Sequence, residues 1–290
     1  MSTDYSYNNN AVTDAINSSY QKKGLGAGYQ LSPGMTHQVH KTWGLEQPGV
    51  NTNKICYVIA TWSGKRRAGN DSFHANPIFY LEKHFSQLEK VKHSLGLVIL
   101  AIPNNPKEPK VFTKYIENLP PTIGGAELKI IRRENIGQSY GSYSNAFDQY
   151  PDSDFYIFME DDYAPIIDYF DDILIQMFKA SPSCGYLCSY AHNRPPEGAH
   201  AAISNGISSR EVLGEIKKIL GALPYGGQAT KSSGYSADPQ LGFSKGFMEA
   251  HKRIYDYLSH YNSPFNDAGT FKMYGENRLP TLIYPIQFLQ

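Results

Sequence analysis

Short apolar segments alternate with helix-like segments through the first two thirds of the chain, and this alternation restricts the possible folds more than any other feature. The four apolar segments are KICYVIATW (54–62), LGLVILAIP (95–103), ELKIIRREN (127–135) and DFYIFMEDD (154–162). The segment between the first two has four apolar residues at helical spacing, namely Ile78, Leu81, Phe85 and Leu88. Strands that alternate with helices form a mainly parallel sheet with helices on both faces. We therefore expect an α/β fold with a Rossmann-like, mainly parallel sheet flanked by helices.

The pattern becomes less regular after the fourth strand. It predicts an amphipathic helix (166–180), a strand (184–192), a helix that Ser208 or Ser209 caps (209–223) and a short strand that leads into a helix (240–261). Residues 1–50 are rich in Ser, Asn, Gly, Tyr and Gln and have little periodic apolar pattern. We expect an irregular N-terminal arm over 1–50 and a single domain over 51–290.

The charge balance excludes partners that depend on a large basic surface. Lys and Arg together number 27, as do Asp and Glu, so the formal net charge is zero, whereas a general nucleic-acid or anionic-membrane binder would show a basic excess. No apolar run approaches the ~20 residues of a membrane span, and the first twenty residues have no basic start followed by an apolar core. Three cysteines make no disulfide framework, so we expect reduced, mostly buried thiols in a cytoplasmic protein with no nucleic-acid partner.

The fourth apolar strand runs directly into three adjacent carboxylates, Glu160, Asp161 and Asp162. Like charges repel one another and an unpartnered buried carboxylate is costly, so either water solvates these groups or a cation binds them. Glu160 and Asp162 point to the same face if the strand continues through them. Mg²⁺ or Mn²⁺ takes one or two carboxylates together with phosphate oxygens. The alternative is a solvated acidic turn that opens the next helix, with Pro165 in an early helical position.

The segment before this strand, RRENIGQSYGSYSNAF (132–147), has the residue types of an anion-binding turn. Arginine recognises phosphate, glycine lets the backbone approach a ligand closely, and the amides at a helix N-terminus face anions. Because ligands of open parallel sheets sit outside the carboxyl ends of the strands, this turn, the three carboxylates and the loop after the first strand are expected to converge. The alternative for 132–147 is an ordinary strand-to-helix turn.

Together these segments resemble the GT-A glycosyltransferases, most nearly the family-2-like members of the nucleotide-diphospho-sugar transferase superfamily. Those proteins carry an R-x-x-N-x-G segment with a following Asn, and then a strand that ends in an Asp-x-Asp-type triplet. The matching residues are Arg132 or Arg133, Asn135, Gly137, Asn145 and FMEDD (158–162). The resemblance is specific over Arg132–Tyr163 and follows the order of elements over 54–285. It implies a GT-A fold with a nucleotide-binding half (51–165) and an acceptor-side half (166–290).

The resemblance also implies a donor site for a UDP- or GDP-sugar and a divalent cation. The residues implied to hold the nucleotide are Ala60, Thr61, Trp62, Arg66, Arg133, Asn135, Gly137, Asn145 and Asp161. Asp162 would be the chief ligand of Mn²⁺ or Mg²⁺, and Glu160 would support it, although the family usually begins this triplet with Asp. For Arg66, a solvated basic loop is the alternative.

Acidic residues in the second half are candidates for the general base that deprotonates an acceptor hydroxyl. Inverting members of the family have a Glu-Asp pair in a segment that resembles MYGENRLPTL, where this chain has Glu276 followed by Asn277. Asn cannot accept the proton, so the role passes to Glu276, or to Asp238 or Asp267 outside this segment. Asp238 is also a candidate for contact with sugar hydroxyls. A salt bridge between Glu276 and Arg278 is the structural alternative.

The expected activity is therefore that of a metal-dependent, inverting glycosyltransferase of the hexosyltransferase type with a carbohydrate or glycoconjugate acceptor. A sugar nucleotidyltransferase is one alternative, because it would also combine a parallel sheet with metal-binding carboxylates. Such an enzyme normally has a Gly-rich, basic loop after the first strand, and TWSGKRRAGN (61–70) has part of that character. A nucleotide-sugar-binding protein without catalytic activity is the other alternative, and it would account for Asn277 in place of a base.

Overall fold

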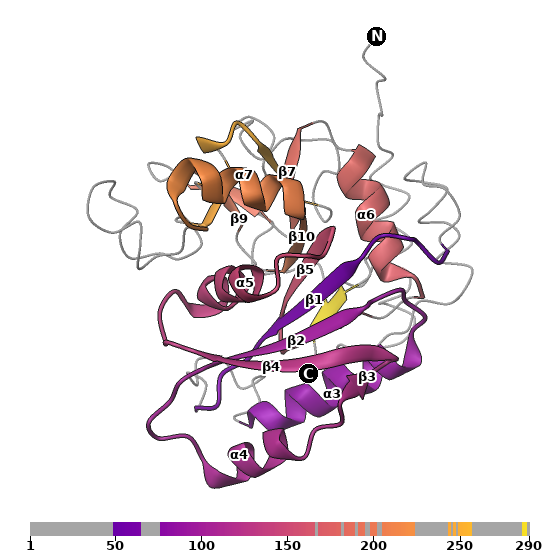
Figure 1. Cartoon of the computed structure of the whole chain (residues 1–290), viewed down its shortest axis with the longest axis vertical. Helices are drawn as coiled ribbons and strands as arrows, with labels where there is room; N and C mark the ends of the chain where they lie inside the picture. Colours follow the sequence, from indigo (N-terminus) through magenta and orange to yellow (C-terminus); the bar gives the residue numbers. More distant parts are fainter. Residues whose placement is uncertain are drawn as a thin grey trace, which may run out of the picture.

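The computed structural model describes residues 49–64, 76–165, 168–180, 183–188, 191–194, 198–201, 205–223, 243–244, 246–247, 249–256 and 286–288. Its main element is an eight-stranded sheet with the order β11-β7-β10-β5-β1-β2-β4-β3 (Figure 1). The strands of this sheet are β1 Ile55–Ala60, β2 Leu97–Pro103, β3 Thr122–Ile123, β4 Ala126–Arg133, β5 Phe155–Glu160, β7 Cys184–Cys188, β10 Gly206–Ser209 and β11 Arg253–Asp256. Two small sheets pair β6 Tyr163–Pro165 with β12 Ile286–Phe288, and β8 Ala191–Arg194 with β9 Gly198–Ala201.

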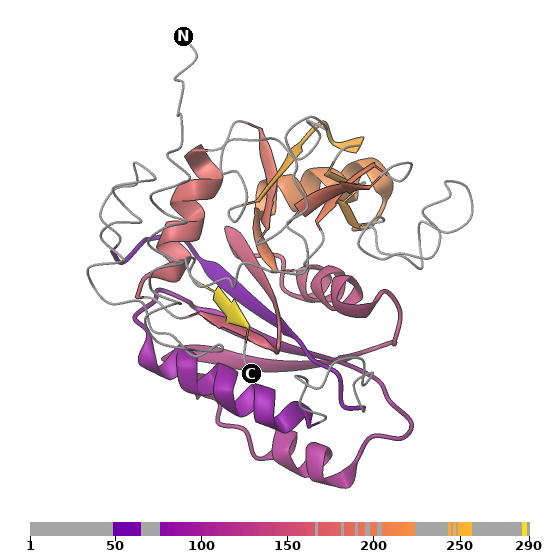
Figure 2. The same cartoon turned by 180° about the vertical axis from the view of Figure 1, so that it is seen from behind.

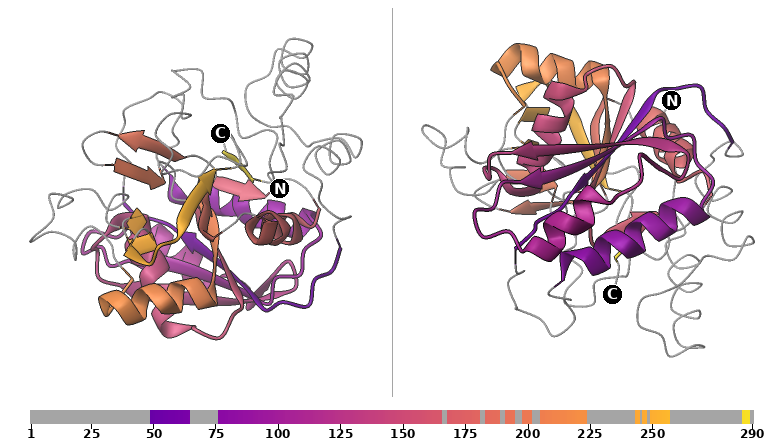
Figure 3. Two further views of the ribbon diagram at one scale, coloured as in Figure 1. Left: turned by 90° about the horizontal axis from the view of Figure 1, so that it is seen from above. Right: turned by 60° about the horizontal axis from the view of Figure 1, so that its bottom comes forward.

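Helices cover both faces of the main sheet. Their bounds are α3 Pro77–Lys90, α4 Lys110–Glu117, α5 Gln138–Gln149, α6 Phe170–Ala180 and α7 Arg210–Leu220. On one face, the Tyr57 ring of β1 contacts His84 of α3 and Phe170 of α6. Figure 2 shows these two helices on that face. On the other face, the Phe158 ring of β5 stacks on Tyr143 of α5 at a centroid distance of 4.6 Å. Figure 3 shows α3 and α4 side by side along one side of the strands.

The central strands are parallel because each is connected to the next by a helix. β1 pairs in parallel with both β2 and β5, and β2 pairs in parallel with β4. Strands that are covered on both faces read as continuous apolar runs, and all six residues of β1 are buried. β10 is the exception in this region, since it runs antiparallel between β5 and β7.

The α/β fold predicted from the sequence is confirmed, as are the first four predicted strands and the helices between them. The helical face predicted for α3, including Leu81 and Leu88, is buried. Ser209 is the cap of α7, because its hydroxyl oxygen accepts a hydrogen bond from the Val212 amide at 3.3 Å. The three cysteines are free and buried. Among the described helices, none has the length and apolar character that a membrane span requires.

Three features of the second half differ from the prediction. The helix expected from about Pro165 begins at Phe170, and Tyr163–Pro165 forms β6 instead, because its edge pairs with β12. Arg253–Asp256 was expected inside a helix, but it pairs in parallel with β7 as β11. β10 was not predicted, since its sequence GISS is short and half serine. The predicted arm over 1–48 lies outside the described residues, and the division into two functional halves stays a prediction.

Candidate functional site

The site lies where the direction of strand addition reverses. From β1 the chain adds β2 and then β4 on one side, and it returns to add β5 on the other side of β1. Open parallel sheets bind ligands outside the carboxyl ends of the strands at such a switch point. Here Ala60, the last residue of β1, is the register partner of Glu160, the last residue of β5. β1 and β5 are neighbours in the sheet (Figure 1), so the loop after β1 lies directly beside the three carboxylates after β5.

The three carboxylates after β5 differ in exposure and in the groups that they accept. Glu160 is partly exposed, and its Oε1 accepts a hydrogen bond from the Ser139 hydroxyl at 2.5 Å. Asp161 is 1% exposed, and its Oδ2 accepts a hydrogen bond from the Thr61 hydroxyl at 2.5 Å. Asp162 is also buried. Thr61 lies in the loop after β1 and Ser139 lies in α5, so two different elements hold the side chains of Asp161 and Glu160.

Main-chain contacts fix the end of β5. The Asp161 amide donates to the Ala60 carbonyl oxygen at 3.0 Å, which extends the pairing of β1 and β5 by one residue. The Glu160 amide donates to Oδ1 of Asn205 at 2.8 Å. Asn205 directly precedes β10, and β10 is antiparallel to β5, so the start of β10 lies at the same edge as the end of β5. The Asn205 side chain is fully buried, and its Nδ2 donates to none of the groups that the structure describes.

A buried histidine lies behind the carboxylates. Nδ1 of His84 is 3.2 Å from the Asp161 carbonyl oxygen, and Nε2 is 2.8 Å from the Tyr57 hydroxyl. A carbonyl oxygen can only accept, so Nδ1 carries the proton and Nε2 accepts from the tyrosine. Burial lowers the pKa of His84 to about 4, against the smaller opposing effect of the Asp161 carbonyl. The ring is therefore neutral at neutral pH.

The loop between β4 and α5 is built around Arg133. The guanidinium is buried and donates to Ser142 Oγ at 2.9 Å, to the carbonyl oxygens of Glu134 at 2.6 Å and Ile136 at 2.8 Å, and to the carbonyl oxygen of Gln138. Arg133 was predicted to bind the nucleotide. In this structure its donors face the loop itself, so the side chain shapes the turn, and direct contact with a nucleotide stays a prediction.

Two glycines allow this turn to pass close to α5. Gly137 precedes the helix with φ of 77°, in the left-handed region that glycine adopts without strain. A Cβ on Gly141 would lie 2.0 Å from the Ile136 carbonyl oxygen, so any larger residue there would displace the loop. The glycine predicted at 137 therefore has a conformational role, and Gly141 has a role that the sequence analysis did not assign.

The two asparagines of the predicted motif occupy different places. Asn135 is exposed in the turn, near the end of β4. Asn145 lies seven residues into α5 from Gln138, about 10 Å along the helix. Its side chain accepts a hydrogen bond from Gln149 at 2.8 Å, one turn further from the strand ends. Asn135 therefore stays an exposed candidate in the turn, while the described contact of Asn145 runs along the surface of the helix.

The loop after β1 is held against the loop after β2. Thr61 and Ser63 are buried, and Trp62 is partly exposed between them. The Thr61 amide donates to the Ala101 carbonyl oxygen at 3.2 Å, and Asn105 Nδ2 donates to Ser63 Oγ at 3.2 Å. Ala60 and Thr61, which were predicted to bind the nucleotide, are therefore buried and held by their neighbours. Trp62, predicted for the same role, is the partly exposed residue of the three.

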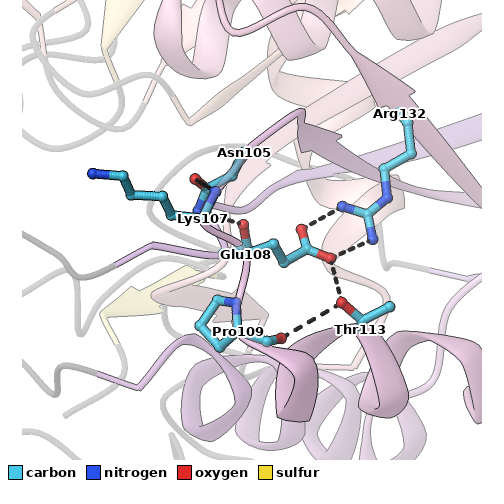
Figure 4. A network of polar contacts seen from close by, with 7 residues as sticks. Asn105, Lys107, Glu108, Pro109, Thr113 and Arg132 are labelled. Carbon is cyan, nitrogen blue, oxygen red and sulfur yellow. Dashed lines mark hydrogen bonds and ion pairs between the residues drawn. The ribbon is translucent and has the colours of Figure 1, made fainter.

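A polar network joins the loop after β2 to α4 and to the end of β4 (Figure 4). Arg132 binds Glu108 through two hydrogen bonds of 2.6 and 2.9 Å, and Thr113 donates to the same carboxylate at 2.9 Å. The Arg132 guanidinium is the main cause of the lowered pKa of Glu108. Arg132 was considered for phosphate recognition, but here its charge is matched by Glu108, which ties the end of β4 to the start of α4.

The carboxylates after β5 fit a cation of the magnesium type better than one that needs many protein ligands. Within the described part of the chain, no group of three His, Cys, Asp or Glu side chains converges as a complete metal site. Mg²⁺ and Mn²⁺ need only one or two carboxylates when phosphate oxygens complete the shell. Because Asp161 accepts from Thr61, Glu160 and Asp162 are the two of these carboxylates left as candidates to hold such an ion, and this role stays a prediction.

Several predicted residues lie outside the described part of the chain. They are Arg66, Asp238 and Glu276, together with the rival base Asp267. Four residues at the site were missed by the sequence analysis: His84, Glu108, Gly141 and Asn205. His84 had a signal, because it is a polar residue on the apolar face of its helix, between Leu81 and Phe85. Asn205 had none, since it precedes a strand that was not predicted.

Comparisons with known proteins returned similar structures only. No protein-family model and no curated protein matches the chain. The chain is similar to GalNAc-T7 with UDP, GalNAc and Mn²⁺, at a TM-score of 0.46 and 10% identity over 79% of this chain and 53% of that one. It is also similar to a cytidylyltransferase from Leptospira borgpetersenii, at a TM-score of 0.43 and 14% identity over 74% of this chain and 79% of that one.

A third similar structure is the glycosyltransferase GlyE from Streptococcus pneumoniae, at a TM-score of 0.40 and 13% identity over 73% of this chain and 47% of that one. The chain thus spans about half the length of GalNAc-T7 and GlyE. Of these three similar structures, GlyE is a glycosyltransferase and the Leptospira borgpetersenii protein is a cytidylyltransferase.

Proposed function

We propose that this protein is a metal-dependent glycosyltransferase that transfers a sugar from a nucleotide-diphosphate donor to an acceptor hydroxyl. The observation that carries the proposal is the position of Glu160 and Asp162 at the switch point, with the end of β1 in register beside them. Carboxylates at this edge suit a cation that also binds diphosphate. The predicted cytoplasmic location, the UDP- or GDP-sugar donor and the glycan or glycoconjugate acceptor belong to this proposal.

The chain's own residues divide the work of donor binding. Glu160 and Asp162 hold Mn²⁺ or Mg²⁺, while Ala60, Thr61 and Trp62 line the nucleotide side of the same edge. Ser139 and Thr61 keep two of the carboxylates in place through hydroxyl donors. The turn shaped by Arg133 brings Asn135 and the start of α5 to the diphosphate. When bound, the cation would neutralise the charge that develops on the leaving nucleoside diphosphate.

Two residues are proposed as the base that takes the acceptor proton, Asp238 and Glu276. Both residues lie outside the described part of the chain, so the sequence alone supports their selection. Direct attack by an acceptor activated in this way would invert the anomeric centre.

Titration calorimetry tests the donor site. UDP and GDP are titrated into the protein with and without Mn²⁺, and we expect binding that requires the metal. Asp162→Asn removes one anionic ligand and should weaken metal-linked binding by about 100-fold or more, equivalent to about 2.7 kcal/mol. Asp148→Asn is the matched control, because Asp148 is an exposed carboxylate on α5 that pairs with Lys217. Equal affinity of wild type and Asp162→Asn for the metal–nucleotide pair would remove this site.

Turnover assays separate the proposed activity from its rivals. A glycosyltransferase releases nucleoside diphosphate from a sugar nucleotide, whereas a sugar nucleotidyltransferase releases pyrophosphate from a sugar phosphate and a nucleoside triphosphate. Metal-linked binding without either product would indicate a binding protein. Asp238→Asn and Glu276→Gln then identify the base, since loss of a general base lowers kcat by about 100-fold or more. The donor affinity of that variant should stay unchanged.

A further inference from the structure

Three buried polar groups form a connected series behind the carboxylates. The Tyr57 hydroxyl of β1 donates to His84 Nε2 at 2.8 Å, and His84 Nδ1 donates to the Asp161 carbonyl oxygen at 3.2 Å. Tyr57 and His84 are both 0% exposed. A buried polar group is costly unless it is hydrogen-bonded, and here each ring nitrogen has one partner. The contact links α3 to the main chain of β5 at the residue where the strand ends.

The Asp161 carbonyl belongs to the peptide group that connects Asp161 to Asp162. Other contacts hold the residues before it: the Asp161 amide is bound by Ala60, and the Glu160 amide by Asn205. Among the described contacts, His84 binds the far side of Asp161, where the chain leaves the sheet and turns into Asp162. A donor at this carbonyl restrains the orientation of the peptide plane, and that plane fixes the Cα position from which the Asp162 side chain extends.

We propose that His84 is a positioning residue, which fixes the Asp161–Asp162 peptide so that Asp162 is presented to the cation and the diphosphate. The inference rests on the proposed function. A ligand that is already oriented binds its ion without the cost of ordering a turn. Outer-shell groups that orient metal ligands change metal affinity by about 10- to 100-fold when they are replaced. His84 acts on main-chain geometry, so its effect should appear in metal affinity.

Two amide substitutions separate this role from simple packing. In His84→Asn the amide nitrogen lies close to the position of Nδ1, so donation to the Asp161 carbonyl is retained. In His84→Gln the amide nitrogen lies close to the position of Nε2, so this donation is lost. Both variants replace the same buried ring by an amide, and both should lower the melting temperature to a similar extent. Leu88→Val, on the same buried face of α3, is a control for loss of packing alone.

The readouts are Mn²⁺ binding followed by electron paramagnetic resonance in the presence of UDP, and calorimetry of UDP in the presence of Mn²⁺. We expect His84→Gln to weaken metal-linked binding by about tenfold or more, and His84→Asn and Leu88→Val to stay within about threefold of wild type. If His84→Gln does not fold, His84→Leu replaces it, because leucine has no donor for the Asp161 carbonyl oxygen. That variant should weaken binding by about tenfold or more.

The outcomes distinguish the two proposals. If wild type binds UDP with Mn²⁺ and His84→Gln or His84→Leu binds equally well, the positioning role is overturned while the proposed function stands. The same conclusion follows if His84→Asn and His84→Gln are weakened equally, because retention of the Nδ1 donor would then make no difference. If wild type shows no metal-linked nucleotide binding, the proposed function fails, and with it the role assigned to His84.

Discussion

Two groups of three carboxylates lie close together in the sequence, and they have different surroundings in the structure. Glu160, Asp161 and Asp162 follow β5, whereas Asp168, Asp171 and Asp172 lie at the start of α6. In the α6 group, each carboxylate accepts a main-chain amide from another segment. The donors are Lys92 to Asp168 at 2.9 Å, Ser94 to Asp171 at 2.7 Å and Gly49 to Asp172 at 3.1 Å.

The β5 group instead accepts side-chain hydroxyls, from Ser139 and Thr61, and it stands at the switch point of the sheet. Main-chain donors bind the α6 carboxylates into the fold, where they fasten neighbouring loops to a helix start that favours negative charge. At the β5 group, the topology supplies an edge where a ligand can bind. The role of an acidic run therefore depends on the strand order around it.

The largest expected effect falls on the α6 group and concerns stability. Asp171 is 0% exposed, and burial raises its pKa from 3.8 to about 6, with smaller opposing contributions from the amides that it accepts. Folding raises this pKa, so the folded state binds the proton more tightly than the unfolded state. The resulting stabilisation is present below the unfolded pKa and is lost as the pH rises through about 6. A shift of this size corresponds to about 3 kcal/mol.

Asp171→Asn should therefore flatten the pH dependence of stability. Urea unfolding of wild type and variant over a pH series measures the difference in the free energy of unfolding. We expect that difference to move in favour of the variant by up to about 3 kcal/mol as the pH rises from about 3 to about 7. Ile175→Val, a buried apolar change in the same helix, should shift the curve by a constant amount. Parallel curves for Asp171→Asn and wild type would contradict this account of the α6 group.

The second expected effect contrasts the two groups through the same chemical change. Glu160→Gln keeps an oxygen for the Ser139 hydroxyl but removes the charge, and we expect Mn²⁺-linked UDP binding to weaken by about 10- to 100-fold, or about 1.4 to 2.7 kcal/mol. Asp172→Asn keeps an oxygen for the Gly49 amide, and we expect it to leave this affinity unchanged. Because Asp172 lies at a helix start, its variant should lose about 0.3–1 kcal/mol of stability. Calorimetry measures the binding and urea unfolding measures the stability of both variants. Weaker binding in Asp172→Asn with unchanged binding in Glu160→Gln would contradict the roles assigned to the two groups.

The sequence predicted those elements whose signal is local and missed those that depend on pairing with distant segments of the chain. β1, β2 and β5 were predicted because burial on both faces makes them continuous apolar runs, whereas β4 alternates buried with more exposed residues. β6, β10 and β11 are three or four residues long, and pairing with distant segments stabilises them. Arg253–Asp256, for example, reads as part of a helix until β7 lies beside it. Local patterns therefore predicted β1, β2, β4 and β5 well and misjudged the edge of the sheet beyond β5.

The site divides in the same way. Glu160 and Asp162 could be proposed from the sequence because three adjacent carboxylates at a strand end are visible there, and their role stays a prediction. The burial of Arg133 within its own turn and the ion pair of Arg132 with Glu108 depend on how loops meet, so neither could be read from spacing. The contribution of Asn205 required knowledge that β10 lies antiparallel to β5. Sequence patterns identified the carboxylates, and the tertiary structure identified the groups that orient them.

The smallest expected effect concerns the hydroxyl that holds Glu160. Ser139 and Ser209 both lie at helix starts, but the Ser209 oxygen accepts from a main-chain amide of its own helix, whereas the Ser139 hydroxyl donates to the carboxylate of Glu160. Ser209→Ala should cost about 1 kcal/mol of stability through the lost cap and leave Mn²⁺-linked UDP binding unchanged. Ser139→Ala removes one hydrogen bond to a charged group that is partly solvated.

Solvent can replace part of that hydrogen bond, so we expect Ser139→Ala to weaken the same binding by only about three- to tenfold, or about 0.7 to 1.4 kcal/mol. Its free energy of unfolding should change less than that of Ser209→Ala, because no helix cap is removed. Ser139→Thr, which retains the hydroxyl, should restore the affinity. If Ser139→Ala instead lowers stability by the larger amount and leaves metal-linked binding intact, the hydroxyl serves the fold, and the β5 group is held in the same way as the α6 group.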